Sequence, residues 1–446
     1  MSLYGSLFTA IGGLTSQSRA LGHISDNVAN SQTAGYKRVD TNFVSFVTRS
    51  TQRAHLPGSV VARPDYQNSV QGTIEQSENP LAMALAGGGF FAASLPGGVD
   101  PATGLPRFDD RTYYTRAGDF RMDRDGFLVN GQGYFLQGWS TDAAGDLDRT
   151  RVGPLRIEQS VFNPIATSEV DLSGNLPATL AATPPALPTV ATRVQIYDSL
   201  GTLRPVDLTY TRTAPNTWTL SVSSPDEVGA PPPRTVELRF GDAGATAPPP
   251  LVTGTPDGTL AKVVNPTGGA TVPTASGAGA AARVVLDMDF GQGAQPVTLG
   301  LGNYGQASGL TQYGDEFSGG ATQNGVPRGS FSSVGVRESG DLVVNYDNGQ
   351  TRVVARVPVV TFSDADRLQR VDGQAFLRTL ESGEARLSDA NANGSGKVVA
   401  GSVERSNVDV ASEFTKLILA QRAYTANTRI VTTADEMLQD AINMRR

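Results

Sequence analysis

Cysteine is absent from this 446-residue chain, and histidine occurs only as His23 and His55. The lack of cysteine excludes a disulfide framework, a thiolate zinc site and a cysteine nucleophile. His23 lies beside an apolar helical row, where a packed or solvated side chain is favoured over a catalytic base. Because the groups that commonly build active sites are so few, we predict that the protein is not an enzyme.

Long apolar runs and blocks of positive charge are also missing. No stretch of 18 apolar residues occurs, so we expect no transmembrane helix. The first residues, Met1–Gly5, lack the basic and apolar regions of a secretory signal, which predicts that any export follows another route. The net charge is -7 and the basic residues are scattered, which argues against a nucleic-acid-binding surface.

Two short segments imitate ligand-binding loops, but each lacks a required residue. Residues 389–394 follow the first half of a calcium loop, D-x-N-x-N-G, yet its twelfth position is Ala400, which cannot supply a bidentate carboxylate. Residues 394–397 read G-S-G-K like the end of a phosphate loop, but Val398 stands where Ser or Thr would hold magnesium. We therefore predict no metal site and no cofactor.

Glycine and proline are abundant, at 50 and 27 residues, which favours many short strands joined by tight turns. The chain is long enough for roughly three domains. Turn signals at Asp125–Gly126, Asn130–Gly131 and Asn348–Gly349 separate apolar runs and predict β-hairpins. The polar segment 31–75 is typical of a linker or arm.

The middle of the chain differs in composition from its flanks. Residues 171–320 contain three proline-rich runs and a Gly/Ala-rich stretch, with strand-like pieces between them. We interpret this segment as an outer β domain inserted into a first β domain, which would consist of 76–170 and 321–404. The fold class predicted is thus mainly β with α-helical termini.

The first 30 residues carry a seven-residue repeat typical of a coiled coil. A helix over 3–28 would be roughly 39 Å long at 1.5 Å per residue. Four glycines interrupt it, each costing about 1 kcal/mol relative to alanine, so the helix needs a partner. The two apolar rows are Leu7, Leu14, Leu21 and Val28, and Leu3, Ala10, Gln17 and Ile24.

The last 40 residues carry a matching repeat, which predicts a helix over 408–444 with Asn407 or Asp409 as its cap. Gln421, Thr428 and Asp435 make the middle of one row polar. Periodicity alone does not separate an intramolecular helical hairpin from an assembly interface. The apolar rows are Val410, Leu417, Tyr424, Val431 and Leu438, with Phe414 and Ile442 on the companion row.

Several motifs resemble the flagellar basal-body rod and hook protein family. Residues 29–37 read A-N-S-Q-T-A-G-Y-K and match the signature A-N-x-x-T-x-G-Y-K that follows the N-terminal helix of that family. Residues 406–410 and 421–424, S-N-V-D-V and Q-R-A-Y, resemble its C-terminal signature. Residues 85–91, 114–120 and 126–130 are similar to internal motifs, so the resemblance runs in family order along the chain.

Length and middle content separate the members of this family. Residues 194–201, V-Q-I-Y-D-S-L-G, and residues 309–314, G-L-T-Q-Y-G, are similar to hook proteins. Rod subunits share the ends but have little or no inserted domain. A distal rod subunit therefore remains the nearest alternative, and a secreted β-rich adhesin a more distant one.

The resemblance implies a structural subunit of the bacterial flagellar hook that self-assembles into a flexible helical tube, a universal joint carrying torque from rod to filament. It implies a homopolymer at the flagellum, exported by the flagellar type III apparatus without a cleaved signal peptide. It also implies distal rod, hook cap and hook–filament junction proteins as partners, and no membrane insertion. In this interpretation 1–30 and 405–446 form the helical polymerisation domain.

The residues expected at the assembly interface are the apolar helical rows and the N-terminal signature. They are Leu3, Leu7, Leu14, Leu21, Ile24, Val28, Asn30, Thr33, Gly35, Tyr36, Val410, Phe414, Leu417, Tyr424, Val431, Leu438 and Ile442.

Overall fold

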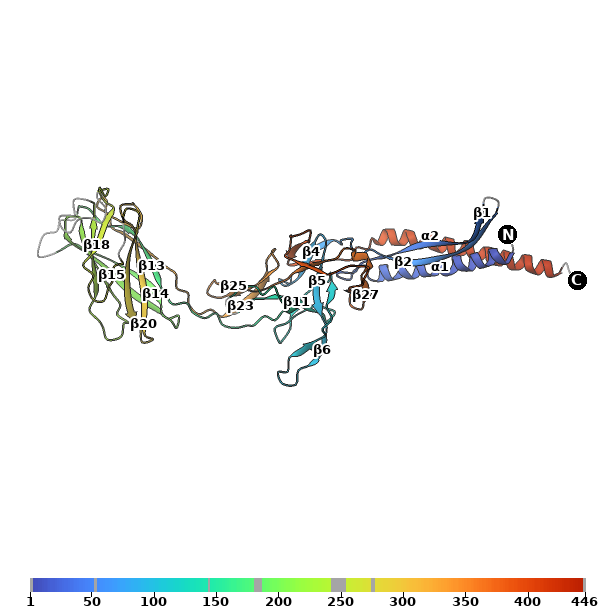
Figure 1. The fold of residues 1–446 in the computed structure, drawn as a ribbon, viewed down its shortest axis with the longest axis horizontal. Coiled ribbons are helices and arrows are strands. Elements are labelled where there is room, and N and C mark those ends of the chain that lie inside the picture. The colour runs from blue at the N-terminus through green and yellow to red at the C-terminus, as the bar shows by residue number, and fades with distance from the viewer. Residues whose placement is uncertain are drawn as a thin grey trace. The chain divides into compact units, whose positions relative to one another are not determined.

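The structure is a computed structural model that describes residues 3–51, 54–142, 145–179, 187–241, 254–273 and 277–443. The predicted fold class is confirmed: the chain is mainly β, with α1 (Leu3–Ala29) and α2 (Val410–Asn443) near its termini (Figure 1). The chain divides into two compact units. Unit 1 comprises Met1–Gln159, Ser332–Asn345 and Thr351–Arg446, and unit 2 comprises Ser160–Phe331 and Tyr346–Gln350.

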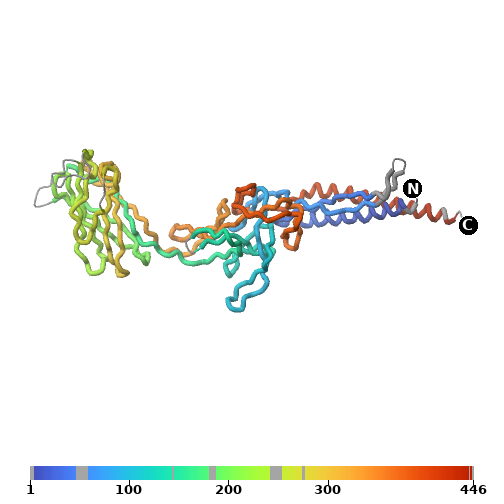
Figure 2. The backbone as a smooth tube through the Cα atoms, in the orientation of Figure 1, coloured from blue at the N-terminus to red at the C-terminus, as the bar shows by residue number. Residues whose placement is uncertain are grey.

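In unit 1, α1 and α2 pack side by side and run antiparallel, with the two chain ends at the same end of the helix pair (Figure 2). Asp409 caps α2, because its Oδ1 accepts hydrogen bonds from the backbone N–H groups of Ala411 at 2.9 Å and Ser412 at 3.2 Å. Asn407, the other expected cap, instead accepts a bond from the N–H of Arg38 at 2.7 Å.

A long β-hairpin follows α1 in the segment expected to be a linker or arm, 31–75. Its strands β1 (Val39–Thr51) and β2 (Ala54–Tyr66) pair antiparallel and lie along α1. The hydroxyl of Ser16 donates to the carbonyl of Val60 at 2.8 Å. The polar composition hides these strands because the two-stranded ribbon packs against the helices and leaves much of its surface in water.

The β part of unit 1 contains the 13-stranded sheet, in which strands from the N-terminal half of the chain lie between strands from the C-terminal half. Its main path is β23 (Phe331–Val336), β24 (Asp341–Tyr346), β25 (Thr351–Arg356), β11 (Phe135–Ser140), β5 (Phe90–Ser94), β8 (Tyr113–Thr115), β28 (Ala375–Leu377) and β27 (Gln369–Val371). Off this path lie β9 (Arg121–Met122), β10 (Leu128–Val129), β12 (Gly153–Pro154), β26 (Val359–Thr361) and β29 (Arg386–Ser388).

Smaller elements complete unit 1. Three two-stranded sheets pair β3 (Ile74–Gln76) with β31 (Ser402–Glu404), β4 (Met83–Ala86) with β30 (Lys397–Ala400), and β6 (Pro96–Val99) with β7 (Pro106–Phe108). A short 3-10 helix, η2, spans Ala365–Arg367. All three predicted hairpin turns are confirmed, between β9 and β10, β10 and β11, and β24 and β25.

Unit 2 has two five-stranded sheets around an apolar core in which Trp218, Leu238 and Leu286 are buried. One sheet consists of β14 (Thr189–Tyr197), β15 (Leu203–Ala214), β16 (Thr217–Ser223), β17 (Arg234–Phe240) and β18 (Leu260–Val264). The other consists of β13 (Glu169–Asn175), β19 (Ala281–Asp289), β20 (Ala294–Asn303), β21 (Leu310–Thr311) and β22 (Ser318–Gln323).

Unit 2 is longer at both ends than the expected inserted segment, 171–320. The additional residues include two extended connecting segments, one that enters the unit and one that leaves it. They run side by side, with bridges between Phe162 and Gly329 and between Ile165 and Val326. The expected segment therefore lies wholly inside unit 2, and the extended connections lie outside it.

Candidate assembly surface

Small side chains line the contact between the two helices. Ala10 and Ala20 of α1 and Ala420 and Ala434 of α2 are buried. A Cβ atom on Gly13 would lie 2.9 Å from the side-chain nitrogen of Asn427, so a larger residue there would displace that side chain where α1 meets α2. The helices of one chain therefore approach closely through small residues.

The predicted leucine rows lie on the flank of this contact. Leu7, Leu14, Leu21 and Val28 of α1 are half-buried, as are Val410, Leu417, Val431 and Leu438 of α2. Ile24 is buried, and the side chain of Leu3 lies outside the described residues. The seven-residue period is present, but the row nearest the partner helix is Glu413, Ala420, Asn427 and Ala434.

Large apolar side chains point away from the helix pair into solvent. Phe8 is 67% exposed, Phe414 51% and Ile418 51%. Exposed apolar residues gathered on one element mark interaction surfaces in soluble proteins. Among the described side chains of the two helices, the exposed large apolar ones are Phe8, Ile11, Phe414, Ile418, Leu419, Tyr424, Ile430, Met437 and Ile442.

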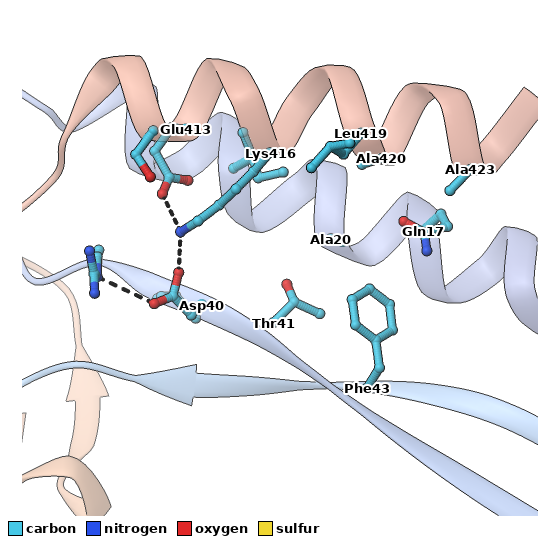
Figure 3. A pocket seen from close by; sticks show the side chains of 14 residues that line it. Gln17, Ala20, Asp40, Thr41, Phe43, Glu413, Lys416, Leu419, Ala420 and Ala423 are labelled. Atoms are coloured by element: carbon cyan, nitrogen blue, oxygen red, sulfur yellow. Dashed lines mark hydrogen bonds and ion pairs between the residues drawn. The ribbon is translucent and has the colours of Figure 1, made fainter.

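A groove of about 600 Å³ lies between α1, α2 and β1. Its apolar part includes Ala20, Phe43, Leu419 and Ala423 (Figure 3). Figure 3 shows Lys416 reaching from α2 across one end of the groove to Asp40 of β1. We call this feature the α1–α2–β1 groove.

Lys416 ties α2 to the hairpin. Its Nζ lies 2.6 Å from Oδ1 of Asp40 and 2.7 Å from Oε1 of Glu413. Burial opposes the charge, but the hydrogen bonds to both carboxylates outweigh it and raise the pKa of Lys416 above its ordinary value. The lysine is therefore charged when the hairpin lies against α2.

Asn27 joins the end of α1 to the hairpin and to α2. Its amide group is fully buried and donates to the carbonyl of Val39 at 2.9 Å and to Oε2 of Glu413 at 3.1 Å. Its Oδ1 accepts from the N–H of Val39 at 2.9 Å and from the hydroxyl of Tyr36 at 3.1 Å. Both amide hydrogens and the amide oxygen are thus hydrogen-bonded, and these bonds offset the cost of removing the Asn27 amide from water.

Glu404 is the centre of a buried charge cluster that joins both ends of the chain to the β part of unit 1. Its carboxylate accepts bonds from Lys37 at 2.6 Å, from Arg116 at 2.9 Å and from the N–H of Gly72 at 2.8 Å. The side chains of Lys37 and Glu404 are 0% exposed. Burial, opposed by Glu404 and reinforced by Arg116, lowers the pKa of Lys37 to about 8.

The N-terminal signature packs against the same cluster. Gly35 has a positive φ of 71°, and a Cβ atom there would lie 2.4 Å from the backbone nitrogen of Ala117. Its N–H donates to the carbonyl of Glu404 at 2.8 Å. Glycine is therefore required for both conformation and close approach.

Arg370 holds the base of the hairpin against the β27–β28 hairpin. Its guanidinium donates to Oδ1 of Asn68 at 2.9 Å and to the carbonyl of Arg38 at 3.2 Å. It also lies 4.9 Å from the ring centre of Tyr66 and 5.8 Å from that of Tyr36. This fork of hydrogen bonds with flanking aromatic rings is a geometry that lysine cannot reproduce.

Of the expected interface residues, Ile24, Gly35 and Tyr36 are buried inside the chain and make internal contacts. Asn30 and Thr33 are half-buried and bond to each other at 3.3 Å just beyond the end of α1. Sequence reasoning missed Lys37, Arg116, Glu404 and Arg370. Lys37 closes the recognised N-terminal signature and Arg116 lies in the recognised motif 114–120, so these two carried a signal, whereas Glu404 and Arg370 lie outside the motifs.

Other kinds of site find little support in the described part of the chain. No group of three or more acidic, histidine or cysteine side chains is placed there to hold a metal ion. Among the described helices, none is both long and apolar enough to cross a membrane.

Four segments of the chain match known protein families. Residues 7–37 match the family described as "Flagella basal body rod protein", and residues 84–175 match "Flagellar hook protein FlgE/F/G D1 domain". Residues 171–326 match "Flagellar basal body protein FlaE D2 domain". Residues 399–444, which include the whole of α2, match "Flagellar basal body rod FlgEFG protein C-terminal".

Curated relatives align along the whole chain. The "Flagellar hook protein FlgE" of Brucella abortus biovar 1 (strain 9-941) is 32% identical over 447 residues, with 100% of both chains covered. The protein of that name from Rhizobium meliloti (strain 1021) is 30% identical over 458 residues, again with 100% of both covered. The crystal structure of Helicobacter pylori flagellar hook protein FlgE2 aligns to this chain with a TM-score of 0.47 and 16% sequence identity. The alignment covers 73% of this chain and 98% of that one.

Proposed function

The chain belongs to the flagellar hook protein family and is a structural subunit of the bacterial flagellar hook, and we propose that copies polymerise through the outer faces of α1 and α2. One observation carries this proposal. Within one chain the two helices pack against each other through small residues, yet large apolar side chains such as Phe8 and Phe414 remain exposed to water. Burying those side chains between copies would supply the driving force for assembly.

Burial in the single chain divides the expected interface residues into those that a neighbouring copy could contact and those that it could not. Leu7, Leu14, Leu21 and Leu438 are half-buried at the flank of the helix contact, where a neighbour could complete their burial. Ile24, Gly35 and Tyr36 support the surface from inside. We propose that the helical domain 1–30 plus 405–446 polymerises, while 171–320 forms the outer domain of the hook.

A role in the hook also suggests which other proteins the chain contacts. Copies at the two ends of a hook would contact the distal rod, the hook cap and the hook–filament junction proteins. The chain would reach this extracellular position through the flagellar type III apparatus. Cells in which that apparatus is inactive should therefore keep the protein inside.

Truncation tests the assembly surface directly. Full-length protein and a variant lacking residues 1–30 and 408–446 would be concentrated and viewed by negative-stain electron microscopy. We expect tubes from the full-length protein and none from the truncated one, whose unit 2 keeps its own core. Tubes from the truncated protein would show that polymerisation does not use the helices.

A genetic experiment separates the hook from the rod. Deleting the gene should leave cells with flagellar rods that lack hooks, since the matches that cover the whole chain are to hook proteins. Cells without rods would indicate a rod subunit instead. Binding of a ligand by unit 2 with no dependence on the termini would indicate an adhesin.

A further inference from the structure

We propose that the α1–α2–β1 groove of one copy receives Phe414 and Ile418 from α2 of a second copy, so that neighbouring subunits make a heterologous contact. We call Phe414 and Ile418 the α2 ridge. The inference rests on the proposed function, because it requires that the helices meet between copies.

The ridge is a continuous apolar feature. Phe414 and Ile418 are four residues apart on α2, which places them one turn apart on one face. Each is 51% exposed, so about half of its surface remains in water in the single chain. Ala411, Gln421 and Thr425, which share this face, are uncharged, and the exposed Arg422 lies one turn beyond Ile418 at the end of the ridge.

The groove matches the ridge in polarity. Its charged lining residues are Arg38, Asp40, Glu413 and Lys416, two of each sign. They neutralise one another, since Asp40 lies 3.3 Å from Arg38 and 2.6 Å from Lys416. An uncharged apolar knob can therefore enter beside Phe43 and Leu419 without leaving a charge unpaired.

The groove and the ridge lie at the same level of α2 but on different faces. Successive residues of a helix are turned by about 100°, so Leu419 in the groove wall points well away from Ile418 on the ridge. One copy can thus offer its groove to one neighbour and its ridge to another. Such heterologous contacts continue from copy to copy, as a polymer requires, and a two-fold dimer does not saturate them.

A second copy suits the groove better than an unrelated partner. The protein is a structural subunit of the flagellar hook, and polymerisation as proposed above would bring many copies of the chain together. Both complementary surfaces are present on every copy, at equal concentration. A partner of another kind would cover the groove and leave the ridge exposed in every subunit.

Disulfide cross-linking tests the pairing, because the natural chain has no cysteine. Ile418→Cys and Ala423→Cys proteins would be purified separately, mixed, polymerised, oxidised and separated on a non-reducing gel. The two positions cannot bridge within a chain, because they lie about 7.5 Å apart along the helix axis and point to different faces. We expect covalent dimers in the mixture and little dimer from either protein alone.

The matched control replaces the groove position by an exposed one. Gly22 of α1 has open space where a Cβ would lie, so Gly22→Cys is accessible and sterically tolerated. Ile418→Cys mixed with Gly22→Cys should yield roughly tenfold less dimer, because only a seated pair reaches an effective concentration in the mM range. Near-UV circular dichroism of each monomer would confirm that the substitutions leave packing intact.

The outcomes separate this inference from the proposed function. Tubes with no excess dimer in the Ile418→Cys and Ala423→Cys mixture would overturn the groove–ridge contact and leave assembly through the helices standing. Strong dimers from Ala423→Cys alone would indicate a two-fold contact and also overturn it. Failure of the natural protein to form tubes under any condition would instead count against the proposed function.

Discussion

Lys37 and Glu404 lie 367 positions apart in the chain, and their side chains form a fully buried ion pair with 2.6 Å between Nζ and Oε1. Arg116, in the β part of unit 1, binds the other carboxylate oxygen of Glu404 at 2.9 Å. One carboxylate thus joins the segment after α1, the segment before α2 and the sheet between them. The cluster is complete only when nearly the whole chain is present, so correct docking of the helices depends on both ends.

Replacing Glu404 with Gln should destabilise unit 1 strongly. The substitution keeps the shape but leaves Lys37 and Arg116 sharing a buried site without a counter-charge. Loss of one partner of a buried pair costs about 3–5 kcal/mol. Urea unfolding of the monomer would measure the loss, and the exposed pair of Lys397 and Glu338 offers the control. Glu338→Gln should change the unfolding free energy by less than about 1 kcal/mol, and equal effects of the two variants would contradict the role of the cluster.

The pH dependence of stability should carry the signature of Lys37. Its pKa falls from 10.5 when unfolded to about 8 when folded, chiefly through burial. Between those values the unfolded chain holds the proton that the folded chain has lost, so this group makes stability rise with pH over that range. Relative to Lys37→Met, the natural protein should gain up to about 3 kcal/mol from pH 7 to 10. A constant difference between the two unfolding free energies across that range would rule this out.

Local patterns in the sequence predicted the elements well. The heptads predicted helices over 3–28 and 408–444, and the structure has Leu3–Ala29 and Val410–Asn443. The side of each helix that faces its partner was harder to predict. Leu417 and Ala420 belong to rows with the same seven-residue period, and periodicity favoured the larger side chain. Close approach of the backbones instead selects the smaller one, as at Gly13.

The charge cluster could not be predicted from the sequence because a single buried charge leaves no periodic trace. Glu404 is the last residue of the short strand β31, and nothing near it in the chain points to Lys37 or Arg116. The glycines of α1 were also interpreted too simply, as residues that only weaken a helix. A Cβ on Gly12 would lie 1.9 Å from the hydroxyl of Ser59, so this glycine lets the hairpin lie against the helix.

Two glycines near the N-terminus should respond in opposite directions to alanine. Gly35→Ala places a Cβ against the backbone of Ala117 and forces a left-handed conformation, which costs about 1–3 kcal/mol for the conformation alone. Gly22→Ala meets nothing within 4 Å and should stabilise α1 by about 0.5–1 kcal/mol. Thermal unfolding of both monomers would measure the two shifts. A stabilised Gly35→Ala variant would show that this close approach is absent in solution.

Phe8→Ser should impair assembly without weakening the monomer. Phe8 is 67% exposed, so its loss removes little intramolecular packing, and the unfolding free energy should change by less than about 0.5 kcal/mol. If a neighbouring copy buries the ring, its removal forfeits about 1.5–3 kcal/mol for each contact, which raises the critical concentration for tube formation by roughly tenfold to a hundredfold. Sedimentation of polymer across a dilution series would give that concentration, with Ser18→Ala, another exposed position of α1, as the matched control. An unchanged critical concentration for Phe8→Ser would place this part of α1 outside the contact between copies, because an exposed phenylalanine that no neighbour covers contributes nothing to polymerisation.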